Sequence, residues 1–316
     1  MKPTVLTVTF NPSLDKTVVL DQLRVGGLNR ARQVRLDAGG KGINVAKLLH
    51  GFQVPVVAAG VCGGAEGGEL TALLQKAGID VDFVEVAGRT RTNLKIVDHS
   101  LQVTTEINEQ GAEVNPRELQ AVMDRIRANL DNATHLVLGG SLPPGVPTNV
   151  YAELIRNAKS RGIITVLDTD GEALKEGLAA APYAVKPNIH ELEQLCGRRL
   201  QSDAEIVEAG KQLLAGGVSL LLISMGGKGS IAMNEREALR VTPFPVTVKS
   251  TVGAGDSMVA AMVYCLLNGK PLSDIAAFTS AAGTITASKE GTQVSSLSEM
   301  LEHVHRVAVA PLQVTY

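Results

Sequence analysis

Two hydrophobic periods alternate along most of the chain. Short apolar runs predict strands over Val5–Thr9, Val54–Ala59, His135–Leu138, Ile163–Leu167, Tyr183–Lys186 and Leu220–Ser224. Longer segments repeat apolar residues at helical spacing, which predicts helices over Ile43–His50, Gly68–Ala77, Pro116–Asn129, Asn149–Arg161 and Ala204–Leu214. Strands that alternate with helices favour a mostly parallel sheet covered by helices.

Two further regions depart from this alternation. The last third of the chain has a helical pattern over Ser257–Asn268, Leu272–Ser288 and Leu297–Val309. Earlier, four short strand candidates lack intervening helices: Lys16–Leu20, Ala31–Leu36, Thr92–Asp98 and Val103–Asn108. They predict a small extra sheet, inserted at about 16–36 and 92–108, that covers a cleft or contacts a second subunit. Since no linker or repeat interrupts residues 1–316, we expect one domain with this sheet as a lid.

Composition narrows the class of protein. The chain has 316 residues, of which 45% are hydrophobic and 20% charged, as is typical of a soluble globular protein. A net charge of −2 and only 3% aromatic residues argue against nucleic acid or a membrane surface as partner. The three cysteines lack Cys-x-x-Cys spacing, which favours free thiols in a reducing, cytoplasmic compartment.

The segment Gly253-Ala254-Gly255-Asp256 is the most informative in the chain. An extended pattern over Leu239–Thr251 precedes it and a helical pattern follows from Ser257, so the glycines fall in a tight turn at a helix start. Unpaired N–H groups and the helix dipole favour an anion there. Asp256 either caps the helix or acts as a general base at the edge of an anion hole. The second reading suits phosphoryl transfer to a hydroxyl.

Two well-known nucleotide-binding patterns are absent from the sequence. No lysine that follows a glycine precedes Ser or Thr, so there is no P-loop. Met258 stands where a Gly-x-Gly-x-x-Gly pattern needs its last glycine, which makes a dinucleotide-dependent oxidoreductase improbable.

A second glycine turn, Gly39-Gly40-Lys41-Gly42-Ile43-Asn44, precedes another predicted helix. Lys41 and Asn44 offer a cation and an amide to a phosphorylated or hydroxyl-rich substrate, although a flexible turn with a solvated lysine explains the pattern equally well. Asp15 follows the first strand, where ligands of open α/β sheets bind. Arg91 opens a lid strand, and Ser141 lies in a glycine turn after a strand. Alone, Asp15 and Arg91 are more often structural, whereas Ser141 is better explained as a substrate contact than as a nucleophile.

Two other loops follow predicted strands. In Lys186-Pro187-Asn188-Ile189-His190-Glu191, Asn188 and Glu191 fit a helix capping box, and the same oxygens also suit the water shell of Mg²⁺. Ser224-Met225-Gly226-Gly227-Lys228-Gly229 lets backbone approach a nucleotide closely.

Taken in order, these motifs resemble those of the ribokinase-like carbohydrate kinases, within them the phosphofructokinase-B branch. The resemblance runs from about Val5 to the C-terminal helices. It implies a three-layer α/β/α domain with a mostly parallel central sheet and a small β-sheet lid, often dimeric through that lid. It also implies phosphoryl transfer from ATP to a sugar phosphate.

The resemblance gives each motif an implied role. Asp256 is the base, and Gly253, Ala254 and Gly255 stabilise the moving phosphoryl group. The residues implied to hold the sugar phosphate are Asp15, Gly39, Gly40, Lys41, Asn44, Arg91 and Ser141. Those implied for ATP are Lys186, Asn188, Glu191, Ser224, Gly226, Gly229 and Thr251. Asn188 and Glu191 match an Asn-x-x-Glu motif that governs Mg²⁺ through water. Gly291-Thr292-Gln293 is compatible with the family's monovalent-cation site.

The sugar is inferred from finer similarities. The segment Asn11–Asp15 is similar to the corresponding segment of the branch that acts on phosphosugars. The Gly-Gly-Lys-Gly turn with Lys41 resembles that of the kinases of fructose 1-phosphate and tagatose 6-phosphate. Thr90–Lys95 and Ser250–Val259 look more like the 1-phosphofructokinases. We therefore expect conversion of fructose 1-phosphate to fructose 1,6-bisphosphate, with tagatose-6-phosphate kinase and 6-phosphofructokinase as alternatives. A non-catalytic sugar-phosphate sensor is a remote alternative, because Asp256, Asn188 and Glu191 are all present.

Overall fold

A computed structural model describes residues 4–291 and 293–312 of the chain. Ten strands form one large sheet in the order β14-β13-β12-β11-β10-β9-β8-β1-β4-β5. Their bounds are β1 Val5–Thr9, β4 Val56–Cys62, β5 Asp80–Glu85, β8 His135–Gly139, β9 Ile164–Asp168, β10 Ala184–Val185, β11 Leu220–Ser224, β12 Ser230–Met233, β13 Ala238–Thr242 and β14 Ala308–Pro311. The strands from β11 to β5 pair in parallel, and β12, β13 and β14 add an antiparallel edge.

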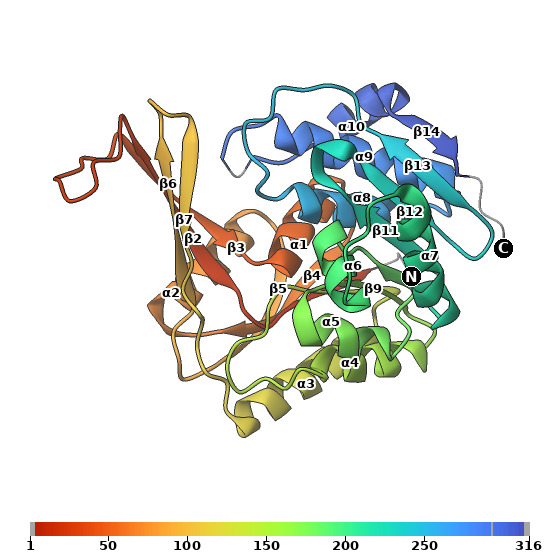
Figure 1. Cartoon of the computed structure of the whole chain (residues 1–316). Helices are drawn as coiled ribbons and strands as arrows, with labels where there is room; N and C mark the ends of the chain where they lie inside the picture. The colour runs from red at the N-terminus through yellow and green to blue at the C-terminus, as the bar shows by residue number, and fades with distance from the viewer. Residues whose placement is uncertain (1–3, 292, 313–316) are drawn as a thin grey trace.

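Helices cover both faces of this sheet, which confirms the predicted three-layer arrangement (Figure 1). The helices are α1 Lys41–Gly51, α2 Gly64–Lys76, α3 Pro116–Leu130, α4 Val150–Lys159, α5 Gly171–Leu178, α6 Ile189–Cys196, α7 Asp203–Ala215, α8 Ala254–Leu267, α9 Leu272–Ala287 and α10 Leu297–His303. Alternate strand residues supply the two cores: Leu220 and Leu222 face α1, α8 and α9, whereas Leu221 and Ile223 face α3, α4 and α7.

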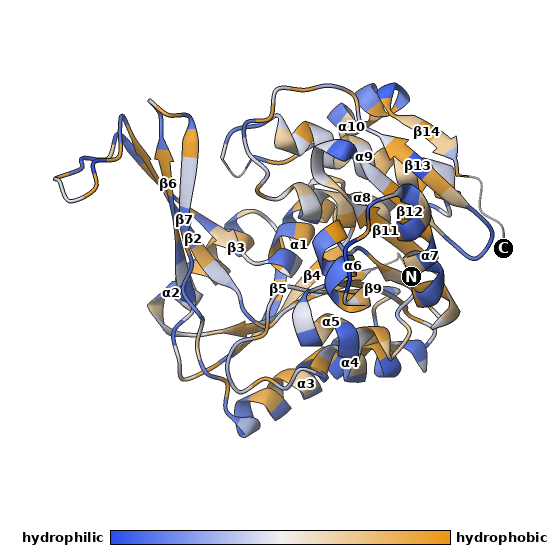
Figure 2. Ribbon diagram, viewed as in Figure 1, coloured by the Kyte–Doolittle hydropathy of each residue, from blue (hydrophilic) through white to orange (hydrophobic). Residues whose placement is uncertain are grey.

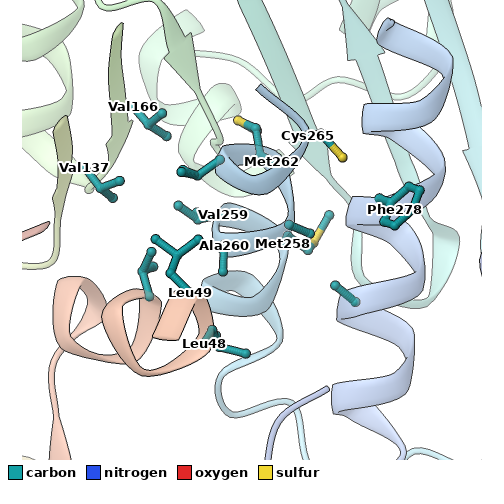
Figure 3. Close-up of a cluster of buried hydrophobic side chains, with 14 of the residues drawn as sticks. Leu48, Leu49, Val137, Val166, Met258, Val259, Ala260, Met262, Cys265 and Phe278 are labelled. Carbon is teal, nitrogen blue, oxygen red and sulfur yellow. The ribbon is translucent and has the colours of Figure 1, made fainter. Parts of the chain in front are cut away.

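The core on the α8 side holds the helix that carries the glycine turn. Figure 3 shows Leu48 and Leu49 of α1 packed against α8, with Phe278 of α9 on its other side. Every residue of α8 from Asp256 to Val263 is buried, because α8 packs against α1, α9 and the sheet together. Truncating Leu49 to Ala would destabilise this core by about 2–5 kcal/mol.

The lid is a separate four-stranded sheet in the order β3-β2-β6-β7, as predicted. Its strands are β2 Ser13–Leu20, β3 Gln33–Gly39, β6 Arg91–Asp98 and β7 Val103–Ile107. The sheet projects to the left of the body in Figure 1, and its strands carry hydrophobic bands in Figure 2. The chain passes directly from β3 into α1 through Gly39 and Gly40, so the lid is tied to the glycine turn.

Several details differ from the predictions. Helix α8 begins at Ala254 rather than Ser257. The helix expected over Leu297–Val309 ends at His303, and the chain then forms a 3₁₀ turn (Val304–Arg306) and strand β14, because pairing with β13 is available there. The extended pattern of Leu239–Thr251 forms a strand only as far as Thr242.

Candidate active site

The parallel strands bring the predicted polar residues to one edge of the large sheet. Asn11, Gly140, Asp168 and Lys186 follow or end β1, β8, β9 and β10, and Ser224 ends β11. The carboxyl ends of parallel strands lie at the same edge, where open α/β sheets bind ligands. The N-termini of α1 and α8 belong to this edge as well, since Asn44 and Asp256 are in contact.

Asp256 lies in the first turn of α8. The N-cap is Gly253, whose φ of +77° is a left-handed conformation that glycine adopts without strain. No side-chain cap bond is present, so the capping reading of Asp256 is wrong. Instead the Asn44 amide Nδ2 donates to Asp256 Oδ2 at 2.8 Å. Asp256 is thus fixed across the interface between α1 and α8. The Ala254 N–H donates to the Thr251 carbonyl at 3.3 Å, and the helix dipole at this α8 start favours an anion.

The electrostatic surroundings of Asp256 suit a proton acceptor. Burial raises the pKa of Asp256, and the neighbouring Asp168 carboxylate raises it further. The Asn44 hydrogen bond and the positive charges of Lys41 and Lys186 act in the opposite direction, and the net pKa is above the ordinary aspartate value. A carboxylate with a raised pKa is a better general base than a solvent-exposed one.

A buried ion cluster lies next to Asp256. Asp168 Oδ1 is 3.1 Å from Lys41 Nζ and 3.4 Å from Lys186 Nζ. Burial raises the pKa of Asp168, but the two lysines outweigh this effect and the net pKa is lowered. Burial lowers the pKa of Lys41, but Asp168, Asp256 and Glu191 together raise it above the usual lysine value. Lys41 therefore carries its positive charge in the site.

The lid places another buried network over the glycine turn. Asp15 Oδ2 accepts from Lys95 Nζ at 2.7 Å, and Asp15 Oδ1 accepts from Ser13 Oγ at 2.7 Å and Asn93 Nδ2 at 3.2 Å. A Cβ on Gly39 would lie 2.7 Å from the Asp15 carboxyl, so only glycine fits there. The predicted residues Asp15 and Gly39 are in contact.

Arg91 and Ser141 meet through Asn11. The Arg91 guanidinium donates from Nη2 to the Asn11 carbonyl at 3.1 Å and from Nη1 to the Glu109 carbonyl at 3.1 Å. The Asn11 amide Nδ2 donates to Ser141 Oγ at 3.1 Å. The predicted sugar-side residues Arg91 and Ser141 therefore lie on either side of a residue that sequence reasoning did not select.

Asn188 and Glu191 form the capping box of α6. Asn188 Oδ1 accepts from the Glu191 N–H at 2.9 Å, and Glu191 Oε2 accepts from the Asn188 N–H at 2.8 Å. Burial raises the pKa of Glu191, which faces Lys41, Asp168 and Lys186 as well. Within residues 4–291 and 293–312, no group of three or more His, Cys, Asp or Glu side chains is placed to hold a metal ion. The oxygens present suit Mg²⁺ held through water and ligand phosphates.

A cavity of about 500 Å³ opens beside the N-terminus of α8. Four residues predicted for the nucleotide line it: Ser224, Gly226, Gly229 and Thr251. Ala254 and Gly255 also line it, so the cavity reaches the glycine turn. Its other lining is mainly small or apolar: Gly227, Ser230, Pro243, Phe244, Pro245, Val246, Val248, Met258, Ser280, Gly283, Thr284 and Ala287.

Sequence reasoning missed several residues of the site. Asp168 gave one local signal, an acid at the end of a predicted strand, which we did not use. Lys95 and Asn93 entered only as members of the segment Thr90–Lys95, which resembles the 1-phosphofructokinases. Their contact with Asp15 depends on the parallel pairing of β2 with β6. The apolar lining of the cavity comes from the segment between β13 and α8 and from α8 and α9 themselves. No local sequence pattern indicates that these segments lie close together.

Comparisons with known proteins agree with this geometry. A family model described as pfkB family carbohydrate kinase matches residues 8–299. The chain is 43% identical over 267 residues to the 1-phosphofructokinase of Xanthomonas campestris pv. campestris, covering 83% of this chain and 84% of that protein. It is 32% identical over 291 residues to the tagatose-6-phosphate kinase of Staphylococcus epidermidis, covering 91% and 93%. The structure of phosphofructokinase-2 from Escherichia coli in complex with potassium matches with a TM-score of 0.91 and 31% identity, covering 97% of this chain and 99% of that one.

These matches span nearly the whole chain, including both glycine turns and the lid. Among the described residues, no helix is long and apolar enough to cross a membrane. The chain belongs to the pfkB family of carbohydrate kinases, phosphotransferases that act on a sugar hydroxyl.

Proposed function

We propose that this chain transfers the γ-phosphoryl group of ATP to the 6-hydroxyl of fructose 1-phosphate, giving fructose 1,6-bisphosphate. One observation carries the proposal: the buried carboxylate of Asp256, fixed by Asn44, lies at the start of α8 beside two charged lysines. This combines a base, an anion-binding helix start and positive charge, which phosphoryl transfer to a hydroxyl requires.

The chemistry follows from these groups. Asp256 takes the proton of the acceptor hydroxyl as its oxygen attacks the γ-phosphorus. The bond between the γ-phosphorus and the bridging oxygen breaks, and ADP leaves with the bonding electrons. The N–H groups at Gly253 and Gly255 bind the phosphoryl oxygens, Ala254 shapes the turn between them, and Lys41 and Lys186 offset the developing charge.

The nucleotide belongs in the cavity lined by Ser224, Gly226, Gly229 and Thr251, because that cavity ends at the helix start where the γ-phosphate must lie. Mg²⁺, when bound, neutralises the phosphates. Glu191 orients its water shell from the first turn of α6, and Asn188 holds Glu191 in place.

The sugar phosphate belongs under the lid. The Asp15 carboxylate, held by Lys95, accepts hydrogen bonds from sugar hydroxyl groups. Arg91 and Ser141 bind the existing phosphate. Gly39 and Gly40 let the backbone approach the sugar, and Gly40 has a φ of +113° that disfavours other residues. The similarity to a 1-phosphofructokinase at 43% identity supports fructose 1-phosphate. The similarity to a tagatose-6-phosphate kinase at 32% keeps that sugar as the second candidate.

We also propose that the lid joins two copies of the chain. The strand register places one set of apolar residues on a single lid surface, here called the apolar lid face: Val18, Val34, Leu36, Leu94, Ile96 and Ile107. Val34 and Ile107 are half exposed, at 50% and 54%. The apolar lid face of a second copy would cover both residues. In each copy, the large sheet and its lid together form one kinase domain. The three free cysteines fit the cytoplasm as compartment.

A monovalent-cation site is proposed at the loop after α9. Ser250 Oγ donates to the Gly291 carbonyl at 2.8 Å, and the Lys249 N–H donates to the Ala287 carbonyl at 2.8 Å. These contacts bring the segment before the α8 glycine turn next to the loop after α9, where backbone carbonyl oxygens can face a cation. Thr292, part of the segment singled out in the sequence, lies outside the described residues. Replacing K⁺ by tetramethylammonium should lower the rate, and an unchanged rate would reject this site.

The direct test incubates the purified protein with ATP, Mg²⁺ and fructose 1-phosphate. We expect one new phosphomonoester on the 6-carbon for each ADP released, read by ³¹P NMR. Release of ADP without a new sugar phosphate would contradict the proposal.

A further inference from the structure

Asp168 is the most deeply buried charged residue of the site, and it has no assigned role. It ends strand β9 and is 3% exposed. A single oxygen, Oδ1, contacts both the Lys41 and the Lys186 ammonium groups, whereas Oδ2 is buried without a hydrogen-bond partner in the part of the chain that the structure describes. A buried carboxylate is tolerated only when positive charge compensates it.

The two lysines reach Asp168 from different functional segments. Lys41 is the first residue of α1 and belongs to the glycine turn that the lid contacts. Lys186 follows β10, and its Nζ would lie 3.5 Å from a Cβ on Gly255, so it lies beneath the start of α8. Asp168 therefore anchors a cation from the sugar side and a cation from the nucleotide side.

We propose that Asp168 is a positioning residue: it holds the Lys41 and Lys186 ammonium groups together beside Asp256, where the phosphoryl group is transferred. The inference rests on the proposed function and adds a role for a residue which that function leaves unused. Without the anchor, both lysine side chains have several rotatable bonds, and Lys41, whose side chain is 34% exposed, can turn toward solvent. The positive charge would then remain but would no longer be fixed where it stabilises the transition state.

The rival explanation is that Asp168 binds Mg²⁺ with the nucleotide. The two explanations differ in what Asp168 acts through. If Asp168 positions lysines, its effect disappears when the lysines are already removed. If Asp168 binds metal, its effect persists in their absence and the Mg²⁺ requirement changes.

The test is a pair of double-mutant cycles with Asp168→Asn, one with Lys41→Met and one with Lys186→Met. We expect Asp168→Asn alone to lower kcat on the order of 10²-fold, as loss of a fixed transition-state contact does. In either Met background we expect a much smaller further fall, and an unchanged Mg²⁺ concentration for half-maximal rate. Effects that multiply in both cycles, or a raised Mg²⁺ requirement, would overturn the proposal.

Urea unfolding of the same variants provides a readout that does not depend on activity. Asp168→Asn should lower the unfolding midpoint less when Lys41 is already Met, because one of its two ion pairs is already lost. Coupling in unfolding without coupling in kcat would mean a purely structural ion cluster and would also overturn the proposal. Coupling in unfolding together with no sugar-kinase activity in the parent protein would instead reject the proposed function. Asp131→Asn, at an exposed pair with Arg161, is the matched control and should change neither measurement.

Discussion

The transfer centre and the lid hold their charged residues in opposite ways. At the transfer centre, Asp256, Asp168 and Lys186 come from a helix start and strand ends that two hydrophobic cores bury. In the lid, Asp15 and Lys95 are equally buried, but on a thin sheet whose strand β7 is exposed along its whole length. The difference suggests a division of labour: a rigid body performs the chemistry, and a sheet that needs covering selects the sugar.

The two faces of the lid carry this division within four strands. Asp15 pairs with Asn93 across β2 and β6, so both lie on the polar face together with Lys95. Val18 and Ile96, whose side chains point to the opposite side of the same strands, pair with each other on the apolar lid face. Because strand side chains alternate, ordering one face by contact with a second copy also orders the other.

Asp256→Asn should have the largest effect. It removes the base while keeping the size of the side chain, so kcat should fall by about 10²–10⁴-fold while both substrates still bind. Steady-state rates with isothermal titration of ATP and sugar phosphate would measure both properties. Asp274→Asn, at a half-buried residue of α9 that pairs with Lys270, is the control and should keep the parental rate. A folded Asp256→Asn protein with near-parental kcat would show that the transfer centre lies elsewhere.

Glu191→Gln should have the next largest effect. If Glu191 orients the magnesium water shell, the Mg²⁺ concentration for half-maximal rate rises several-fold, because a neutral amide attracts the ion less. Thermal unfolding should change little, since Gln also completes a capping box. The opposite pattern, an unchanged Mg²⁺ dependence with a lower Tm, would reduce Glu191 to a helix cap.

Charged residues on the apolar lid face should affect the sugar more than the chemistry. Val34→Glu with Ile107→Glu should yield monomers by light scattering, because two like-charged faces repel and lose their apolar contact. The KM for the sugar phosphate should rise several-fold with a smaller change in kcat. Leu301→Glu, at a residue 54% exposed on α10, is the matched control and should remain dimeric. A monomeric parent protein would remove the lid contact from the account.

The smallest effect concerns pH. Activity requires ionised Asp256, whose pKa is raised, so kcat/KM should fall on the acid side at a higher pH than an ordinary aspartate would give. Lys41 lowers the pKa of Asp256, so Lys41→Met should raise it further and move the acid limb to higher pH. Lys76→Met, at an exposed residue at the end of α2, should leave the limb in place. An acid limb that moves to lower pH in Lys41→Met would contradict the charge arrangement.

The sequence predicted most of the fold because its signals are local. Val5–Thr9 and Leu220–Ser224 are short apolar runs that form strands with the predicted bounds, since buried parallel strands need no alternation. Strand β5 was missed because its three acidic residues break the continuous apolar run that marks the buried parallel strands, although their alternation with apolar residues suits a sheet edge. Strand β14 was missed because only pairing with β13 distinguishes it from the preceding helix pattern.

The candidate site was predictable where a backbone turn marks it. Gly253 near Asp256 and Gly39 and Gly40 near Lys41 are such marks, because a left-handed φ or a close approach restricts those positions to glycine. Asp168 and Lys95 have no comparable mark. Their positions depend on which strands become neighbours, as β9 does with β10 and β2 with β6. Contacts of this kind arise from tertiary structure and leave no local pattern.

One measurement tests the central claim most directly: kcat/KM for fructose 1-phosphate, fructose 6-phosphate and tagatose 6-phosphate, measured side by side with ATP and Mg²⁺. We expect the highest value for fructose 1-phosphate and a poor value for unphosphorylated fructose, because the contacts of Arg91 and Ser141 with the existing phosphate position the acceptor hydroxyl. A clear preference for either of the other two sugar phosphates would contradict the assigned substrate while leaving the kinase chemistry intact.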